Sequence, residues 1–395
     1  MSVPLWKVKR ELVRLVLQIG GLPRRLIWYY GATPFYDRIL SKQRQSWVGE
    51  QEASSKMAVM VIYPTDGLLD SHALTLRHLA ENGYASVVVS NLPLSSDDRD
   101  RVLTHCAHYI ERPNFGYDFG AYRDGVLSIS DKLPDLDRLV LTNDSAWYPL
   151  PNTSNWLREA EKLNVDLAGA VSNYGTPRSN HASFRTLRWA YSTDHPNFHY
   201  CSFALSFGLN ILKSNAFRRF WSDFQMDNDK SRVVRRGEIG LTRWVIRNGF
   251  THDCTCKPET LPDVLENLTD DRLRQVVQRT IFPEYPLGQA AKKSVLDVPF
   301  DDPEWRPLAT RYVLMAATVQ GTSYALPELT TKEMRFPFLK KSPLRLSRAG
   351  SDISLDIIAE IPGRTGKIVL QEANLLRQSR TTKYDALEKS GHHDQ

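Results

Sequence analysis

The chain has 395 residues, of which 42% are hydrophobic and 24% are charged, a composition typical of a folded globular protein and not of a disordered one. Its net charge of +6 is concentrated in residues 1–48, where nine basic residues outnumber two acidic ones, so the rest of the chain is nearly neutral. A positive charge at one terminus gives no support to nucleic-acid binding and favours contact with an anionic membrane or partner.

The N-terminal residues 1–56 are predicted to form a basic helical extension and a linker. The longest apolar run, residues 12–22, contains Arg14 and is far shorter than the ~20 residues that a membrane-spanning helix needs. It also does not resemble a signal peptide. An amphipathic helix fits this run, and it could lie on a membrane or pack on the protein's own core. With four irregularly spaced cysteines, we expect a reducing, cytoplasmic location, with peripheral membrane contact as an option.

Residues 57–256 are expected to form one α/β domain. Continuous apolar runs predict strands buried on both faces, and the helical segments between them predict a mostly parallel sheet flanked by helices. The strands are expected at residues 58–63, 85–90, 109–110, 139–142, 167–171 and 202–208. The helices are expected from residue 70 to a stop at residues 82–83, and at residues 96–108, 120–129, 153–163, 214–224 and 237–248.

The pattern weakens after residue 256. Residues 257–310 are rich in proline and show one convincing helix, at residues 270–278. We therefore expect an irregular C-terminal region at residues 257–377, whose role the sequence does not indicate. The polar residues 378–395 are expected to be a disordered tail.

The segment at residues 114–125, Asn-Phe-Gly-Tyr-Asp-Phe-Gly-Ala-Tyr-Arg-Asp-Gly, carries the strongest chemical pattern. Gly116 and Gly120 allow tight turns and the close approach of a ligand to the main chain. The spacing is not that of a dinucleotide-binding loop. Polar side chains alternate with aromatic ones that could stack on a ligand or fill the core, and we favour a ligand-binding turn over a purely structural one. The polar candidates are Asn114, Asp118 and Arg123.

Polar residues also follow two of the predicted strands. Asn143 and Asp144 end the apolar run at residues 139–142, and ligands bind beyond the carboxyl ends of parallel strands. An aspartate there suits Mg²⁺ or Mn²⁺ bound to a diphosphate, although a simple capping turn fits equally well. Tyr63 and Asp66 at the end of the first strand are candidates for base or ribose contacts, with a turn as the alternative.

Glu238 is a candidate general base. We expect it in the first turn of the helix at residues 237–248, beside Arg235 and Arg236, whose charges would keep it ionised. Spacing alone favours a glutamate that merely complements the helix dipole. The histidines form no spaced metal-binding set, and no nucleophile elbow or P-loop is present, which removes most support from hydrolase and NTPase functions.

The order of these motifs resembles the rhamnan synthesis protein F family, glycosyltransferase-like proteins of bacterial surface polysaccharide assembly. The resemblance covers roughly residues 57–253. The segments that match this family are residues 114–125, 139–150 and 237–244. More distantly, the layout is similar to family 2 glycosyltransferases with a GT-A fold.

The resemblance implies a GT-A-like domain that binds a nucleotide sugar such as dTDP-L-rhamnose and transfers the sugar, with inversion, to a growing lipid-linked glycan. It places Asn114 and Gly116 at the donor, Asp144 at the metal and Glu238 at the catalytic base. The strand end holds one carboxylate where GT-A enzymes have an Asp-x-Asp motif, so Arg123, Arg235 or Arg236 would help to neutralise the diphosphate. Non-catalytic scaffold and nucleotidyltransferase functions remain the alternatives.

Overall fold

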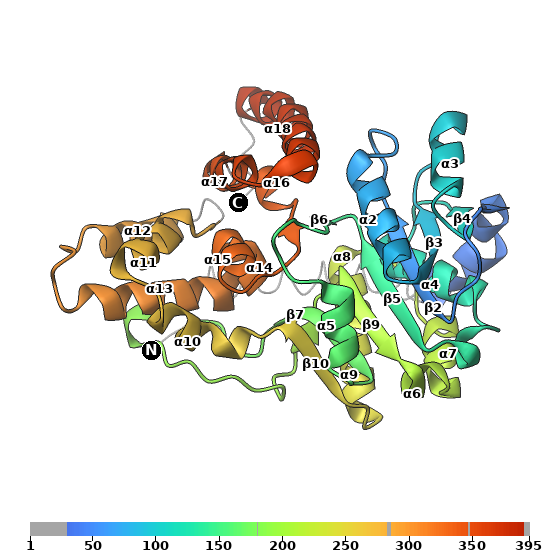
Figure 1. Cartoon of the computed structure of the whole chain (residues 1–395), viewed down its shortest axis with the longest axis horizontal. Coiled ribbons are helices and arrows are strands. Elements are labelled where there is room, and N and C mark those ends of the chain that lie inside the picture. Colours follow the sequence, from blue (N-terminus) through green and yellow to red (C-terminus); the bar gives the residue numbers. More distant parts are fainter. Residues whose placement is uncertain (1–29, 180, 283–285, 347, 391–395) are drawn as a thin grey trace, which may run out of the picture.

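The computed structural model describes residues 30–179, 181–282, 286–346 and 348–390 (Figure 1). The amphipathic helix predicted at residues 12–22 lies outside the described residues and stays a prediction. Within the described part, no helix is both long and apolar enough to cross a membrane. A sheet with its flanking helices and a separate group of C-terminal helices lie side by side (Figure 1).

The central sheet confirms the predicted α/β fold. Its strands are β1 (Gln45–Val48), β2 (Lys56–Ile62), β3 (Tyr84–Ser90), β4 (His108–Glu111), β5 (Arg138–Asn143), β7 (Leu167–Asn173), β8 (His199–Tyr200), β9 (Ala204–Gly208) and β10 (His252–Cys256). Their order is β1-β4-β3-β2-β5-β9-β7-β10, with β8 paired to β7. The neighbours from β4 to β5 run parallel, as do β7 and β10, while β1, β8 and β9 pair antiparallel. The sheet is therefore mostly parallel.

Most helices of this part lie where the sequence predicts them, with shifts of a few residues at their ends, whereas α6 and α8 were not predicted. They are α2 (Asp70–Glu81), α3 (Ser96–Leu103), α4 (Tyr117–Ser128), α5 (Trp156–Lys162), α6 (Leu209–Leu212), α7 (Asn215–Ser222), α8 (Lys230–Val234) and α9 (Gly240–Arg247). Short 3₁₀ turns lie at η1 (Leu40–Gln43), η2 (Leu133–Asp135), η3 (Phe184–Thr186) and η5 (Pro258–Thr260), and a π-helical turn at η4 (Arg235–Ile239).

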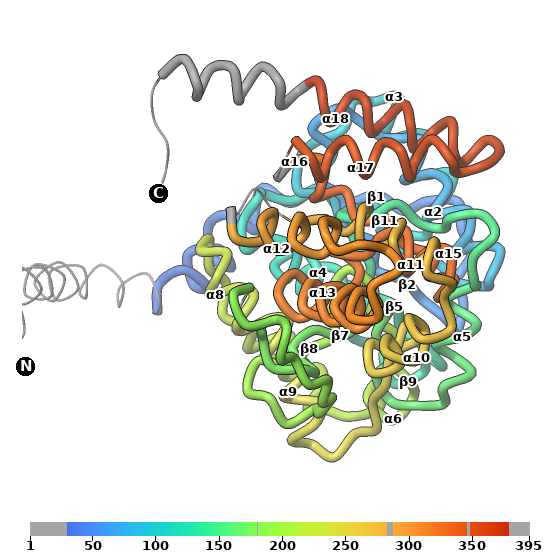
Figure 2. Tube along the Cα trace, turned by 90° about the vertical axis from the view of Figure 1, so that its left-hand side faces the viewer, coloured from blue at the N-terminus to red at the C-terminus, as the bar shows by residue number. Residues whose placement is uncertain are grey.

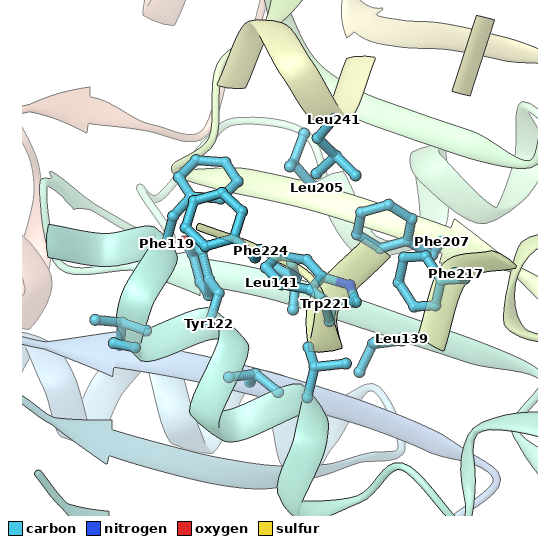
Figure 3. Close-up of a cluster of buried hydrophobic side chains, with 14 of the residues drawn as sticks. Phe119, Tyr122, Leu139, Leu141, Leu205, Phe207, Phe217, Trp221, Phe224 and Leu241 are labelled. Atoms are coloured by element: carbon cyan, nitrogen blue, oxygen red, sulfur yellow. The ribbon is translucent and has the colours of Figure 1, made fainter. Parts of the chain in front are cut away.

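The sheet separates two hydrophobic cores, because alternate residues of each central strand point to opposite faces. In β2, Val59 and Val61 join the core beneath α4 and α7, whereas Met60 and Ile62 join the core beneath α2 and α5. Figure 3 shows the first core, in which aromatic side chains of α4 and α7 interleave. Burial on both faces explains why the strands of the sheet are the most recognisable elements of the sequence.

The predicted boundary at residue 57 places the start of this domain too late. Strand β1 pairs with β4, and Tyr36, on the helix that spans residues 30–38, is fully buried in the core with Ala32. Residues 49–55, which we expected to belong to a linker, therefore connect β1 and β2 of one sheet. Tyr36 donates a short hydrogen bond to the buried Asp124 carboxylate of α4, which ties the N-terminal segment to the helix at the site.

The prediction of an irregular C-terminal region is wrong, since this region consists mainly of helices with a core of their own. Prolines misled the sequence analysis: Pro262 and Pro327 each lie in the first turn of a helix, where the missing N–H has no partner to lose. The helices are α10 (Leu261–Glu266), α11 (Asp270–Arg279), α12 (Pro286–Leu296), α13 (Trp305–Gln320), α14 (Thr322–Ala325), α15 (Pro327–Lys332), α16 (Pro343–Leu346), α17 (Arg348–Ala359) and α18 (Gly363–Ser390).

Helix α18 also corrects the prediction of a disordered tail from residue 378, because its backbone is helical as far as Ser390. Its axis runs along the top of the molecule beside α17 (Figure 2). A small two-stranded sheet links this region to the central one: β11 (Leu339–Lys340) pairs antiparallel with β6 (Ala146–Trp147), which follows β5 almost directly. Residues 339–341 thereby lie next to the turn at Asp144.

Candidate functional site

Asp144 lies at the carboxyl ends of the adjacent parallel strands β2 and β5, as predicted. Its backbone N–H donates to Val61 O (3.1 Å), and its Oδ2 accepts from Tyr63 N (2.8 Å). Burial alone would raise the pKa of the Asp144 carboxyl, but the His72 contact, the Lys341 charge and the Tyr63 N–H together hold this pKa below its usual value. Asp144 is therefore a fixed, ionised carboxylate at neutral pH.

His72 on α2 is a contact of Asp144 that the sequence analysis missed. The ring is almost fully buried, and its Nδ1 accepts a hydrogen bond from Leu69 N (3.2 Å), so the ring proton of neutral His72 lies on Nε2. Nε2 is 3.4 Å from Asp144 Oδ2. This arrangement fixes the orientation of the carboxylate, because one of its oxygens faces both the histidine and the Tyr63 amide.

Asp118 on α4 is the second carboxylate at this edge. Asn143 Nδ2 donates to Asp118 Oδ2 (2.9 Å), and Asn143 Oδ1 accepts from Ser145 N (3.1 Å), so one buried amide joins the helix to the strand end. Burial, followed by the negative charges of Asp144 and Glu238, raises the pKa of Asp118 to about 7. Asp144 and Glu238 are therefore close enough to Asp118 for their charges to act on it.

Glu238 is the third carboxylate, and its setting differs from the prediction. The helix begins earlier, at Lys230, so Glu238 lies in the π-helical turn η4 between α8 and α9 and not in a first helical turn. Such turns are often found at functional sites. Its Oε1 accepts from Ser202 N (3.0 Å) and, in a short hydrogen bond, from Ser202 Oγ, while His199 Nε2 is 3.9 Å from Oε2.

Two glycines shape the backbone next to α4, one in the 114–125 segment and one in the turn η4. Gly116 adopts a left-handed conformation (φ 83°) just before α4 and donates its N–H to Asn228 Oδ1 (2.8 Å). A Cβ atom on Gly237 would lie 2.4 Å from the Phe119 ring, so only glycine lets the turn that carries Glu238 approach α4. This contact brings Asp118 and Glu238 into the same site.

The aromatic side chains of the segment mostly fill the core, which decides between the two options that the sequence leaves open. Phe115, Phe119 and Tyr122 are buried, and Phe119 stacks with Phe224 at a centroid distance of 5.7 Å (Figure 3). Tyr117, by contrast, is 43% exposed. Asn114, Tyr63 and Asp66 are also exposed, and Asp66 accepts from Thr65 Oγ1 at 2.9 Å.

The three predicted arginines do not gather at the carboxylates. Arg123 is buried and donates to both carboxylate oxygens of Asp37 (2.7 and 3.0 Å) and to the carbonyl oxygens of Trp221 and Ser222. Arg236 is 3.4 Å from Asp227 Oδ2 and borders a surface cavity beside α7. Arg235 is exposed, and the cations whose charges lower the pKa of Asp118 are Lys340 and Lys230.

Lys340 and Lys341, which the sequence analysis missed, bring positive charge to the site from the C-terminal region. Lys340 Nζ donates to Ser145 Oγ (3.2 Å) and lies 4.1 Å from the centre of the Phe203 ring. Lys341 donates its backbone N–H to Ser145 O (3.0 Å). No sequence motif marks these lysines, because they are nearly 200 residues from Asp144. The pairing of β11 with β6 brings them close to it.

Three carboxylates and two lysines thus surround the carboxyl ends of β2 and β5. The described residues contain no group of three or more histidine, cysteine, aspartate or glutamate side chains arranged to hold a metal ion. Mg²⁺ that is shared with substrate phosphates needs only one or two protein carboxylates, however. Asp144 and Asp118 are two such groups at one edge of the sheet. Burial and then the Asp144 charge raise the pKa of Asp118, and a bound cation would offset this negative charge.

Comparison with known proteins finds a matching family and similar proteins from two bacteria. Residues 86–277 match the model of a family described as rhamnan synthesis protein F. A protein termed y4gN from Sinorhizobium fredii is 32% identical over 308 residues, which cover 74% of this chain and 76% of that protein. The virulence protein VirA from Vibrio anguillarum is 27% identical over 208 residues, covering 50% of this chain and 59% of VirA.

Two solved structures of glycosyltransferases are also similar to this chain. The mannosyltransferase PcManGT from Pyrobaculum calidifontis, in complex with GDP-Man and Mn²⁺, has 13% identity and a TM-score of 0.30, with coverage of 93% of this chain and 91% of that one. Core-mannan synthase A from Aspergillus fumigatus, in a form with Mn and GDP, has 11% identity and a TM-score of 0.25, with coverage of 50% and 68%.

Proposed function

The chain belongs to the rhamnan synthesis protein F family of glycosyltransferase-like proteins, and from this premise we propose that it transfers a sugar from a nucleotide sugar to a bacterial surface polysaccharide or lipid-linked glycan. The proposed donor is dTDP-L-rhamnose, and the proposed catalytic domain is GT-A-like. We further propose that the enzyme works in the cytoplasm, with its basic N-terminal segment on the inner face of the plasma membrane.

One observation carries the proposal: Asp118, Asp144 and Glu238 come from three separate elements and converge at the carboxyl edge of the sheet. Asn143, next to Asp144, donates to Asp118, and its backbone N–H donates to Phe203 O, next to the Ser202 that binds Glu238. A partly buried group of like charges costs folding free energy unless a ligand or ion compensates it, so it is more typical of a functional site than of a structural one. The carboxyl edge of a parallel sheet is also where ligands bind in α/β proteins.

The proposed chemistry is a single displacement with inversion. Glu238 accepts the proton of an acceptor hydroxyl, whose oxygen attacks the anomeric carbon while the bond from that carbon to the diphosphate oxygen breaks. Ser202 holds Oε1 of Glu238 with two hydrogen bonds, which leaves Oε2 as the oxygen for the proton. Exposed Tyr63, Asp66 and Asn114 are suited to contacts with the base and ribose of the donor.

A divalent ion fits this scheme as a helper of the leaving group. Asp144, fixed by His72 and Tyr63, and Asp118, fixed by Asn143, would hold Mg²⁺ or Mn²⁺ together with the phosphate oxygens of the donor. When bound, the ion would offset the negative charge that develops on the departing diphosphate. Asp118 then takes the place of the second carboxylate that the strand end lacks.

A donor screen tests the proposal. The full chain is incubated with a panel of nucleotide sugars, lipid-linked acceptors and Mn²⁺, and release of nucleoside diphosphate is measured. We expect release with one donor, reduced at least ~100-fold in Glu238→Gln, because the amide cannot accept the hydroxyl proton. Glu266→Gln on exposed α10 is the matched control and should retain activity.

The same screen separates the enzyme from a non-catalytic scaffold with a GT-A-like fold. A scaffold would release no nucleoside diphosphate with any donor, and its Glu238→Gln variant would behave as the unchanged chain does. Equal rates for the unchanged chain and Glu238→Gln would show that this glutamate is not the base.

A further inference from the structure

Lys340 lies in a part of the chain to which the proposed function assigns no role. Strand β11 follows the helices α10–α15 and lies outside residues 86–277, the part that matches the family. It nevertheless pairs with β6, so that Leu339 lies opposite Trp147 and Lys340 opposite Ala146, two residues after Asp144. The C-terminal region therefore contributes a side chain to the edge of the sheet where the three carboxylates lie.

The ammonium group of Lys340 faces these carboxylates without pairing to any of them. Lys340 Nζ donates a hydrogen bond to Ser145 Oγ and lies over the Phe203 ring, 4.1 Å from its centre. Among the described residues, no carboxylate oxygen lies within 4.0 Å of Lys340 Nζ, yet its charge acts on both Asp118 and Glu238. Burial lowers the pKa of Lys340, and the negative charges of Glu238 and Asp118 act in the opposite direction.

A network of buried hydrogen bonds fixes the strand that carries Lys340. Glu372 of α18 accepts from Ser71 N (2.9 Å), Ser71 Oγ (2.7 Å) and Trp147 Nε1 (2.8 Å), and Lys341 Nζ is 4.0 Å from the same carboxylate. Because Trp147 is the strand partner of Leu339, this network holds β6 and β11 together. Lys340 is thus a positioned cation and not a mobile surface lysine.

We propose that Lys340 binds the diphosphate of the donor nucleotide directly and stabilises it as the sugar leaves. The inference rests on the proposed function and deepens it, because it names the cation at the leaving group. Lys340 contacts Ser145, the neighbour of Asp144, and interacts electrostatically with Asp118 and Glu238, whereas Arg123 and Arg236 are engaged elsewhere. A diphosphate there would give the ammonium the direct anionic partner that the protein does not supply.

Binding of nucleoside diphosphates tests this role. The full chain is titrated in a calorimeter with dTDP, UDP and GDP in EDTA, and the tightest ligand is used for the variants. Lys340→Met keeps the length of the side chain and its packing on Phe203 but removes the charge. We expect its Kd to rise at least ~10-fold, since a hydrogen bond to a charged group is lost. Lys340→Arg, which keeps the charge, should recover part of the affinity.

The control is Lys213→Met at the exposed end of α6, which removes one positive charge far from the edge and should leave Kd unchanged. If the unchanged chain binds a nucleoside diphosphate and Lys340→Met binds it within twofold of the same Kd, the role of Lys340 is refuted while the proposed function stands. Equal losses in Lys340→Met and Lys340→Arg would also refute it, because they would indicate a packing role. If the unchanged chain binds none of the three ligands, either in EDTA or with Mn²⁺, both proposals fail.

Discussion

The sheet and the C-terminal helices contribute to the site in different ways. The sheet supplies Asp144 at a strand end, and its neighbours α4 and η4 supply Asp118 and Glu238. The C-terminal region supplies Lys340 and Lys341 through a strand of only two residues. A site can therefore draw its negative charge from one part of a chain and its positive charge from another. Substitutions in each part can show how far the two contributions depend on each other.

The largest effect is expected from Asp144→Asn, which tests the contribution of the sheet alone. The amide keeps the shape of the side chain but loses the charge that faces His72 and a bound cation. We expect transfer to fall by about 10³-fold, as charge stabilisation in the transition state is lost. The rate of nucleoside diphosphate release with saturating Mn²⁺ measures this, with circular dichroism as the control for folding. A loss of less than tenfold would contradict the assignment.

A smaller effect is expected from Glu372→Ala, which tests whether α18 holds β11 in place. The variant removes a buried acceptor of three hydrogen bonds and leaves Lys341 without its nearby carboxylate. The free energy of unfolding should drop by about 3 kcal/mol. Urea unfolding monitored by tryptophan fluorescence measures the drop. Transfer should also fall under conditions in which the variant is fully folded, and unchanged transfer would show that the anchoring of β11 does not matter to the site.

The raised pKa of Asp118 predicts how the stability of the fold depends on pH. Its pKa in the folded protein is raised to about 7, above the value of the unfolded chain, so its contribution favours folding at low pH and is lost as pH rises through about 7. Asp118→Asn should therefore raise the melting temperature at pH 8, by about 2–4 °C in EDTA, and have little effect near pH 4. Melting curves of both proteins across this range measure the difference, and a stabilisation that is equal at all pH values would contradict the prediction.

The smallest effect is expected from His72→Gln, a change in the support of Asp144. The glutamine loses the Nε2 contact at 3.4 Å but leaves the Tyr63 amide in place. We expect transfer to fall about tenfold, with the affinity for Mn²⁺ falling in parallel. His78→Gln, on the same helix but packed against Tyr148, is the comparison variant and should retain transfer. Similar losses in both variants would indicate damage to α2 and not to the site.

The sequence predicts the structure best for strands that are buried along their whole length. A strand such as β2, buried along its whole length, is visible as an apolar run, and the polar residue that follows it marks the edge of the sheet. Asp144 could therefore be placed from the sequence alone. Glu238 was harder to place, because the helical pattern continues through η4 and hides the earlier start at Lys230.

The partners of these residues were not predictable in the same way. Arg123 lies in the pattern that resembles a donor site, yet it pairs with Asp37, 86 positions earlier in the chain. Lys340 is not part of a sequence motif. Its proximity to Ser145 depends on the packing of all the helices and strands that lie between them in the chain, and on the β6–β11 pairing. Contacts between residues so distant in sequence are set by tertiary packing, on which local patterns carry no information.

A crystal structure of the full chain with a nucleoside diphosphate and Mn²⁺ would test the central claim most directly. The account predicts that the diphosphate lies at the carboxyl ends of β2 and β5, that the ion contacts Asp144, and that Lys340 Nζ lies within hydrogen-bonding distance of a phosphate oxygen. A nucleotide bound at any other place on the molecule, with Asp144, Asp118 and Lys340 all free of it, would contradict the account.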